Sequence, residues 1–74
     1  MNDLTKMSLK VFANAEDISP YGVVTSDEIL TSLKMFMSDE IAIKVNKNIT
    51  KLVRFSTDGQ TTPRDILTAL RMVF

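Results

Sequence analysis

The fold is decided by a segment that occurs twice, first as Thr25-Ser-Asp-Glu-Ile-Leu-Thr-Ser-Leu-Lys-Met-Phe-Met37 and again as Thr62-Pro-Arg-Asp-Ile-Leu-Thr-Ala-Leu-Arg-Met-Val-Phe74. The offset is 37 positions, half of the 74-residue chain. The identical pairs are Thr25/Thr62, Ile29/Ile66, Leu30/Leu67, Thr31/Thr68, Leu33/Leu70 and Met35/Met72. Any two amphipathic helices resemble each other to some degree, but Ser19/Ser56 and Gly22/Gly59 also keep this register. The sequence therefore predicts two copies of one unit, residues 1–37 and 38–74, in a single domain.

Composition excludes several classes of protein. Apolar residues make up 45% and charged residues 24% of the chain, which is typical of a globular domain. No apolar run approaches the ~18 residues that span a bilayer, and no apolar segment follows a basic start, so we expect a cytoplasmic protein without a membrane span. Cysteine and histidine are both absent, which excludes disulfides, thiolate or imidazole metal sites and nucleophilic triads. We expect neither an enzyme nor a cofactor.

Hydrophobic periodicity predicts a helix, a loop and a helix in each unit. The first helix is expected to begin at Asn2 or Asp3, and residues 16–24 are expected to form the first loop because the periodicity stops there. The residues expected to face the core are Leu4, Met7, Val11 and Phe12 in the first helix, Ile29, Leu30, Leu33 and Phe36 in the second, and Ile41, Val45, Ile49 and Leu52 in the third.

Helix starts are marked by capping residues. Thr25 followed by Glu28 forms a capping box, in which each side chain accepts a backbone N–H of the other residue. Ser38 is the expected cap of the third helix, and residues 55–61 form the second loop. Thr62 and Asp65 repeat the capping box, with Pro63 at the first helical position. The coarse expectation is four short helices with two matched loops.

The loops resemble those of EF-hand proteins, in which about twelve residues carry a glycine at position six and a carboxylate at position twelve. Positions one, three, five, six and twelve are Asp17, Ser19, Tyr21, Gly22 and Glu28 in the first copy. In the second copy they are Arg54, Ser56, Asp58, Gly59 and Asp65. The resemblance covers the whole chain and implies an all-α fold of two tandem EF-hands, with Val24 and Thr61, at position eight, in a short β-bridge between the loops.

Both loops depart from the calcium-binding pattern. The first offers only two charged ligands, Asp17 and Glu28, and has Tyr21 at position five. The second has the cation Arg54 at position one, and Asp65 at position twelve is one methylene shorter than glutamate. Because losing a carboxylate removes much of the attraction for a hard cation, we expect that neither loop binds calcium at cytosolic levels or magnesium.

A single pair of EF-hands that lack calcium ligands resembles one lobe of calmodulin, and most of all the single-lobe light chains of class I myosins. That resemblance implies a monomeric, calcium-independent module of the cytoskeleton that clamps the basic, amphipathic IQ helix of a motor protein's neck. The residues expected to form the groove for this helix are Leu33, Phe36, Met37, Ile49, Val53, Leu70, Val73 and Phe74. Methionine side chains are flexible and suit a groove that accepts an apolar helix. The acidic residues Asp17, Asp27 and Glu28 are expected to orient the basic end of the partner helix.

Two alternatives remain open from the sequence. Residues 1–37 hold three basic and five acidic side chains, and residues 38–74 hold six basic and four acidic side chains. The chain therefore has no net charge, but its first half is slightly acidic and its second half slightly basic. Lys44, Lys47, Lys51 and Arg54 form a stripe that is either a solvated face or, in a small DNA-binding domain, a phosphate-contacting face. An acidic start at Asp39 and the lack of base-reading side chains argue against nucleic acid. The second alternative is an S100-like homodimer that buries the apolar tips.

Overall fold

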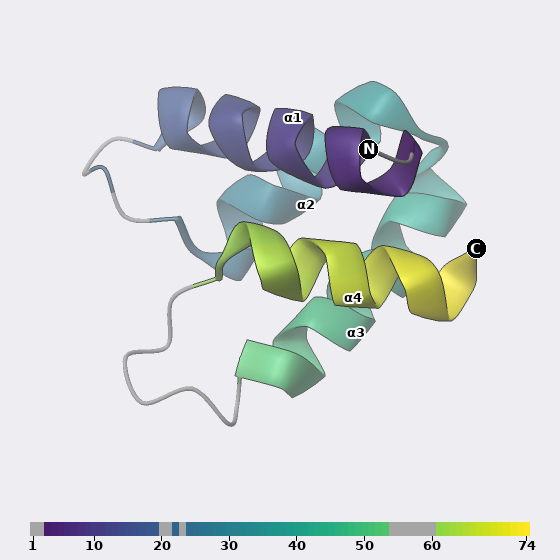
Figure 1. The fold of residues 1–74 in the computed structure, drawn as a ribbon. Coiled ribbons are helices and arrows are strands. Elements are labelled where there is room, and N and C mark those ends of the chain that lie inside the picture. Colours follow the sequence, from purple (N-terminus) through teal and green to yellow (C-terminus); the bar gives the residue numbers. More distant parts are fainter. Residues whose placement is uncertain (1–2, 20–21, 23, 54–60) are drawn as a thin grey trace.

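Four helices account for most of the chain in this computed structural model, which describes residues 3–19, 22, 24–53 and 61–74 (Figure 1). They are α1 (Asp3–Ile18), α2 (Ser26–Phe36), α3 (Asp39–Val53) and α4 (Pro63–Val73). The described residues include no strand. The expected all-helical architecture of four helices is therefore confirmed at this level.

Helix α1 is longer than predicted. The loop was expected to begin at Glu16, but helical hydrogen bonding continues to Ser19, whose N–H donates to the Ala15 carbonyl at 3.1 Å. The prediction was wrong because it relied on apolar periodicity, whereas Glu16 and Ile18 lie on an exposed final turn that needs no apolar stripe. Pro20 follows in the sequence, and a residue that precedes proline is disfavoured in a helix, which accounts for the end of α1.

The predicted caps are present. The Glu28 carboxylate accepts the backbone N–H of Thr25 at 3.1 Å, and the Thr25 hydroxyl also donates to it. At the start of α4, the Asp65 carboxylate accepts the Thr62 N–H at 3.2 Å, while the Thr62 hydroxyl accepts the Asp65 N–H at 3.3 Å. The Ile41 N–H donates to the Ser38 hydroxyl at 3.4 Å, as expected of the cap of α3. Local sequence therefore fixes where three of the helices begin.

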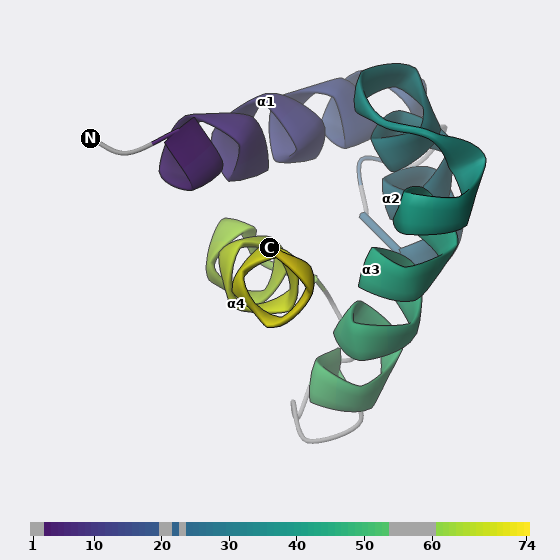
Figure 2. The ribbon, with the colours of Figure 1, turned by 90° about the vertical axis from the view of Figure 1, so that its right-hand side faces the viewer.

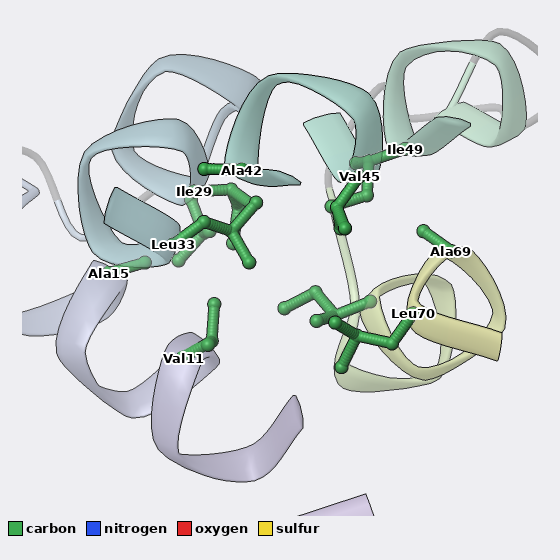
Figure 3. Packing of buried hydrophobic residues seen from close by; sticks show 11 residues of the cluster. Val11, Ala15, Ile29, Leu33, Ala42, Val45, Ile49, Ala69 and Leu70 are labelled. Atoms are coloured by element: carbon green, nitrogen blue, oxygen red, sulfur yellow. The ribbon is translucent and has the colours of Figure 1, made fainter. Parts of the chain in front are cut away.

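The helices pack as a ring in which each touches two others (Figures 1 and 2). Helix α1 packs on α2 and α4, and α3 packs on the same two helices. The ring brings the first helix of one unit against the second helix of the other, so the two units share one core instead of folding separately. The fully buried apolar side chains point into its centre (Figure 3): Val11, Ala15, Ile29, Leu33, Ala42, Val45, Ile49, Ile66, Ala69 and Leu70.

Most predicted core positions are confirmed, with one error. Leu4, Met7, Phe12, Leu30, Ile41 and Leu52 are partly buried against this core. Phe36, predicted to be buried, is exposed. It is the last residue of α2, one turn beyond the buried Leu33, and it borders a hollow beside the start of α1 instead of packing into the core.

One hydrogen bond joins the segments that precede α2 and α4. The Thr61 N–H donates to the Val24 carbonyl at 3.4 Å, which places the two residues expected at position eight side by side. Both side chains are buried, and neither residue lies in a strand. Gly22, at the expected sixth position of the first loop, has a φ of 72°, a left-handed conformation that favours glycine.

Candidate functional site

Apolar side chains are exposed where α2 and α4 end. Met35 is 62% exposed, Phe36 42%, Met72 59% and Phe74 61%, and we call these four residues the tip. The start of α1, the link from α2 to α3 and the end of α4 lie together at this end of the molecule, opposite the end of α1 and the start of α4 (Figures 1 and 2). Met35 and Met72 are equivalent in the repeat, so both units contribute the same kind of surface.

The predicted groove is only partly accessible. Leu33, Ile49 and Leu70 have no exposed surface and belong to the core. Met37, Val53 and Val73 are partly buried against that core. Of the eight predicted partner-binding residues, Phe36 and Phe74 alone are exposed. In this conformation the eight residues do not form one accessible surface, because the helices that would border the groove are packed against each other. The groove stays a prediction, and it requires these helices to separate on contact with a partner.

A polar clasp, which sequence reasoning missed, holds α1 to α2. The buried Ser32 hydroxyl donates to the Val11 carbonyl at 2.8 Å. The Asn14 side-chain amide donates to the Ser32 hydroxyl oxygen and to the Met35 sulfur, both at 3.0 Å. A serine at a core-facing position of α2, three residues after Ile29, was the available signal.

The second unit has no equivalent of this clasp. Ala69 stands at the position of Ser32, and Lys51 stands at the position of Asn14. Ala69 is fully buried and offers no hydroxyl to α3. The two units therefore share a backbone plan but differ in the polar contacts between their helices.

A hollow of about 240 Å³ lies beside the tip. It is lined by Asp3, Lys6, Met7, Lys10 and Phe36, so the exposed aromatic ring borders the start of α1. Apolar and charged groups of both signs meet here. This mixed lining suits the side of an amphipathic helix, in which apolar and charged positions lie next to each other.

The acidic residues expected to orient a basic partner lie elsewhere. Asp17 is in the last turn of α1, and Asp27 and Glu28 are in the first turn of α2, at the loop end of the molecule (Figure 1). Asp27 and Glu28 line a separate hollow with Ile18 and Thr31. That expectation is corrected, because α1 and α2 run in opposite directions and carry these residues away from the tip.

The Glu28 carboxylate is engaged in capping. Its pKa lies below the ordinary value of 4.5, first because the Thr25 hydroxyl donates to it, then because backbone N–H groups of Glu28 and Thr25 do so. Asp65 caps α4 in the same manner. Both position-twelve carboxylates therefore already accept hydrogen bonds within the chain.

The described EF-loop positions do not gather a metal site. Asp17 is exposed in the last turn of α1, Ser19 follows the end of that helix, Gly22 lies between α1 and α2, and Glu28 and Asp65 lie in the first turns of α2 and α4. Within residues 3–19, 22, 24–53 and 61–74, no three acidic side chains are close enough to hold an ion. Tyr21, Arg54, Ser56, Asp58 and Gly59 lie outside the described residues.

Comparisons with protein-family models, with curated proteins and with solved structures found no match for this chain. In the described part of the chain, no helix is both long and apolar enough to cross a membrane.

Proposed function

We propose that this chain is a calcium-independent, light-chain-type module that binds one amphipathic, basic helix of the IQ kind found in a myosin neck. The observation that carries this proposal is the tip, where the ends of α2 and α4 expose Met35, Phe36, Met72 and Phe74. Exposed methionine and aromatic side chains are typical of surfaces that accept the apolar face of a helix. The duplicated helix-loop-helix plan supports the same function through the EF-hand resemblance.

The partner helix first meets the tip and then enters between the units. Leu33, Ile49 and Leu70 are fully buried in the free chain, so their contribution requires the helices around them to separate. A partner drives this change only if it binds the open conformation more tightly than the closed one. The first unit resists opening through the Ser32 clasp, whereas the second unit has Ala69 at that position. We therefore expect the second unit to open first.

Acidic side chains near the tip complement a basic helix. Asp39 and Glu40 are exposed in the first turn of α3, directly after the end of α2. Asp3 shares a hollow with Phe36, where Lys6 and Lys10 also lie, so the acidic character of this end comes from the start of α3. Rim charges of this kind orient a partner more than they add affinity. They take the role that the sequence assigned to the acidic residues at the loop end.

A binding titration tests the proposal directly. A synthetic basic, amphipathic IQ peptide is titrated into the chain by calorimetry, once with calcium and once with a chelator. We expect the same dissociation constant in both, because the position-twelve carboxylates are engaged in capping. Absence of binding in both conditions, or binding only with calcium, contradicts the proposal. Recovery of a myosin heavy chain from lysate in both conditions would identify the partner.

An S100-like homodimer is the second candidate, favoured by the apolar exposure of the same tip. A dimer that buried Phe36 and Phe74 would remove this surface from water without any other partner. Sedimentation without peptide separates the two functions. A mass that rises with concentration favours the dimer, and a constant monomer mass favours the helix-binding module, which is expected to act in the cytoplasm as a monomer.

A further inference from the structure

A second hollow, of about 410 Å³, lies between α3 and α4, away from the clasped first unit. It is lined by Lys44, Lys47, Asn48, Lys51, Met72 and Val73. The lysines and the asparagine come from α3, and the two apolar side chains come from the end of α4. We call this surface the lysine hollow. It combines an apolar wall with three cationic groups, and no acidic side chain of the described residues lines it.

The three lysines repel one another. Their spacing of three and four residues places them on one face of α3, where neighbouring like charges destabilise a helix. Among the described residues, none of the three takes part in an ion pair. An anionic partner in the hollow would relieve this repulsion as well as form new contacts.

The repeat supplies an internal comparison. The equivalents of Lys44, Lys47, Asn48 and Lys51 in the first unit are Met7, Lys10, Val11 and Asn14. At the positions of the three lysines of the second unit, the first unit therefore has one lysine, Lys10. In the first unit the Asn14 amide contacts the Met35 sulfur. Met72, the equivalent of Met35, instead lines the lysine hollow and is well exposed. The first unit has a smaller hollow at the equivalent place, lined by Met7, Lys10 and Phe36 together with Asp3 and Lys6, so it carries charges of both signs. The hollow of the second unit is larger and is lined by three lysines.

We propose that the lysine hollow binds an acidic, amphipathic peptide segment of another protein. An apolar side chain of this segment packs on Met72 and Val73, and flanking carboxylates pair with Lys44, Lys47 and Lys51. The Asn48 amide offers both a donor and an acceptor for a peptide group. This surface differs in charge from the tip but shares Met72 with it, so the site for a basic helix and the site for an acidic segment adjoin at Met72.

A peptide is favoured over an anionic membrane or a nucleic acid by two observations. The chain has a net charge of zero, whereas proteins held on polyanionic surfaces by charge rely on a basic excess. The three lysines also surround a hollow with an apolar wall, which matches a short segment with one inserted side chain better than a broad, uniformly charged surface.

The test uses a fluorescent synthetic peptide with a central leucine flanked by glutamates, together with a second peptide in which every glutamate is glutamine. We expect the glutamate peptide to bind in an anisotropy titration, to weaken as salt is added, and to bind about tenfold more tightly than the glutamine peptide. Lys47→Glu should weaken the glutamate peptide about tenfold or more. The control is Lys34→Glu, which makes the same change of charge at an exposed lysine in the last turn of α2 that lines none of the hollows described here, and which should leave this affinity unchanged.

Four results would overturn the proposal. The first is an equal loss of affinity for the glutamate peptide in Lys47→Glu and Lys34→Glu. The second is equal binding of the glutamate and glutamine peptides. The third and fourth are a lack of peptide binding together with binding to phosphatidylserine vesicles or to duplex DNA. Circular dichroism of both variants checks that the fold is retained. The basic IQ peptide is titrated in parallel, because Lys47→Glu should spare it, so failure at the lysine hollow is distinguished from failure at the tip.

Discussion

The hydroxyl of Ser32 donates a hydrogen bond of 2.8 Å to the backbone carbonyl of Val11. It ties the middle of α2 to the middle of α1 within the core, and the Asn14 amide donates to the same oxygen from the other side. A buried hydroxyl with both a donor and an acceptor role is fully satisfied, so this contact stabilises one relative position of the two helices.

Ser32→Ala should lower the free energy of unfolding by about 1–2 kcal/mol, because the Asn14 amide loses its buried acceptor and the two helices lose their polar contact. The measurement is urea denaturation followed by circular dichroism. Ser8→Ala is the matched control, since Ser8 is also buried but donates only within its own helix, to the Thr5 carbonyl at 2.7 Å. If both variants lost the same free energy of unfolding, the hydrogen bonds between α1 and α2 would add no more stability than a hydrogen bond within one helix.

Thr61→Val should raise the free energy of unfolding by about 1 kcal/mol. Thr61 is buried, and its hydroxyl oxygen has no hydrogen-bond partner among the described residues. The equivalent residue of the first unit is Val24, which is buried in the core. A valine side chain is therefore expected to fit at position 61 as well. Valine removes an unsatisfied polar group and keeps the backbone hydrogen bond to Val24. Thr68→Val, which changes an exposed hydroxyl bonded to the Arg64 carbonyl, is the control and should have little effect. A destabilised Thr61→Val would mean that its hydroxyl is satisfied.

The capping box at Thr25 should make stability depend on acid pH. Because the pKa of Glu28 is lowered in the folded chain, its contribution is present above the ordinary value of 4.5 and is lost as pH falls through the lower, folded value. The difference in stability between the natural chain and Glu28→Gln should therefore shrink as pH falls below 4.5. Urea midpoints measured between neutral and strongly acid pH check this. Glu16→Gln, at an exposed position on α1, is the control, and a difference that grew in acid would contradict the assignment.

Phe36→Ala should weaken binding of the basic IQ peptide about tenfold or more, as truncation of an aromatic anchor does in many interfaces. Because Phe36 is already 42% exposed, the fold should tolerate its loss better than that of a core aromatic residue. Calorimetry measures the affinity. Ile18→Ala is the matched control, since Ile18 is 37% exposed at the opposite end. Lys47→Ala should also change this affinity little. Binding that depended on Lys44, Lys47 and Lys51 and ignored Phe36 would contradict the tip model.

Calcium at micromolar concentration should neither give a binding isotherm nor raise the melting temperature. An ion that binds only the folded chain stabilises it in proportion to the logarithm of its concentration above the dissociation constant. The carboxylates of Glu28 and Asp65 are engaged in capping. Asp17 is exposed at the end of α1. A micromolar isotherm would contradict this prediction, and its loss in Asp17→Asn would assign the ion to the first loop.

The helices were predictable because their signals are local. The Thr25 and Thr62 capping boxes and the apolar stripes fixed helix starts and most core positions from neighbouring residues alone. The end of α1 was misplaced because an exposed final turn carries no apolar pattern. Whether Phe36 is covered depends on where other helices end, which periodicity does not encode.

The candidate sites were harder to predict than the helices. The groove was inferred for an open arrangement, whereas Leu33, Ile49 and Leu70 are enclosed when the helices pack together. The clasp depends on a serine of α2 facing a carbonyl of α1, and the lysine hollow depends on α4 lying beside the α3 lysines. Both require the relative position of two helices, which single-sequence patterns leave undetermined.

The ring of helices has a consequence for how the two units depend on each other. Moving along the sequence by one repeat takes α1 to α3 and α2 to α4, so the contact between α1 and α4 is the repeat equivalent of the contact between α2 and α3. The two contacts that join the units are thus related like the two halves of the two-fold interface of a homodimer. One unit by itself would leave both of these faces uncovered, so it would need a second copy of itself to bury them.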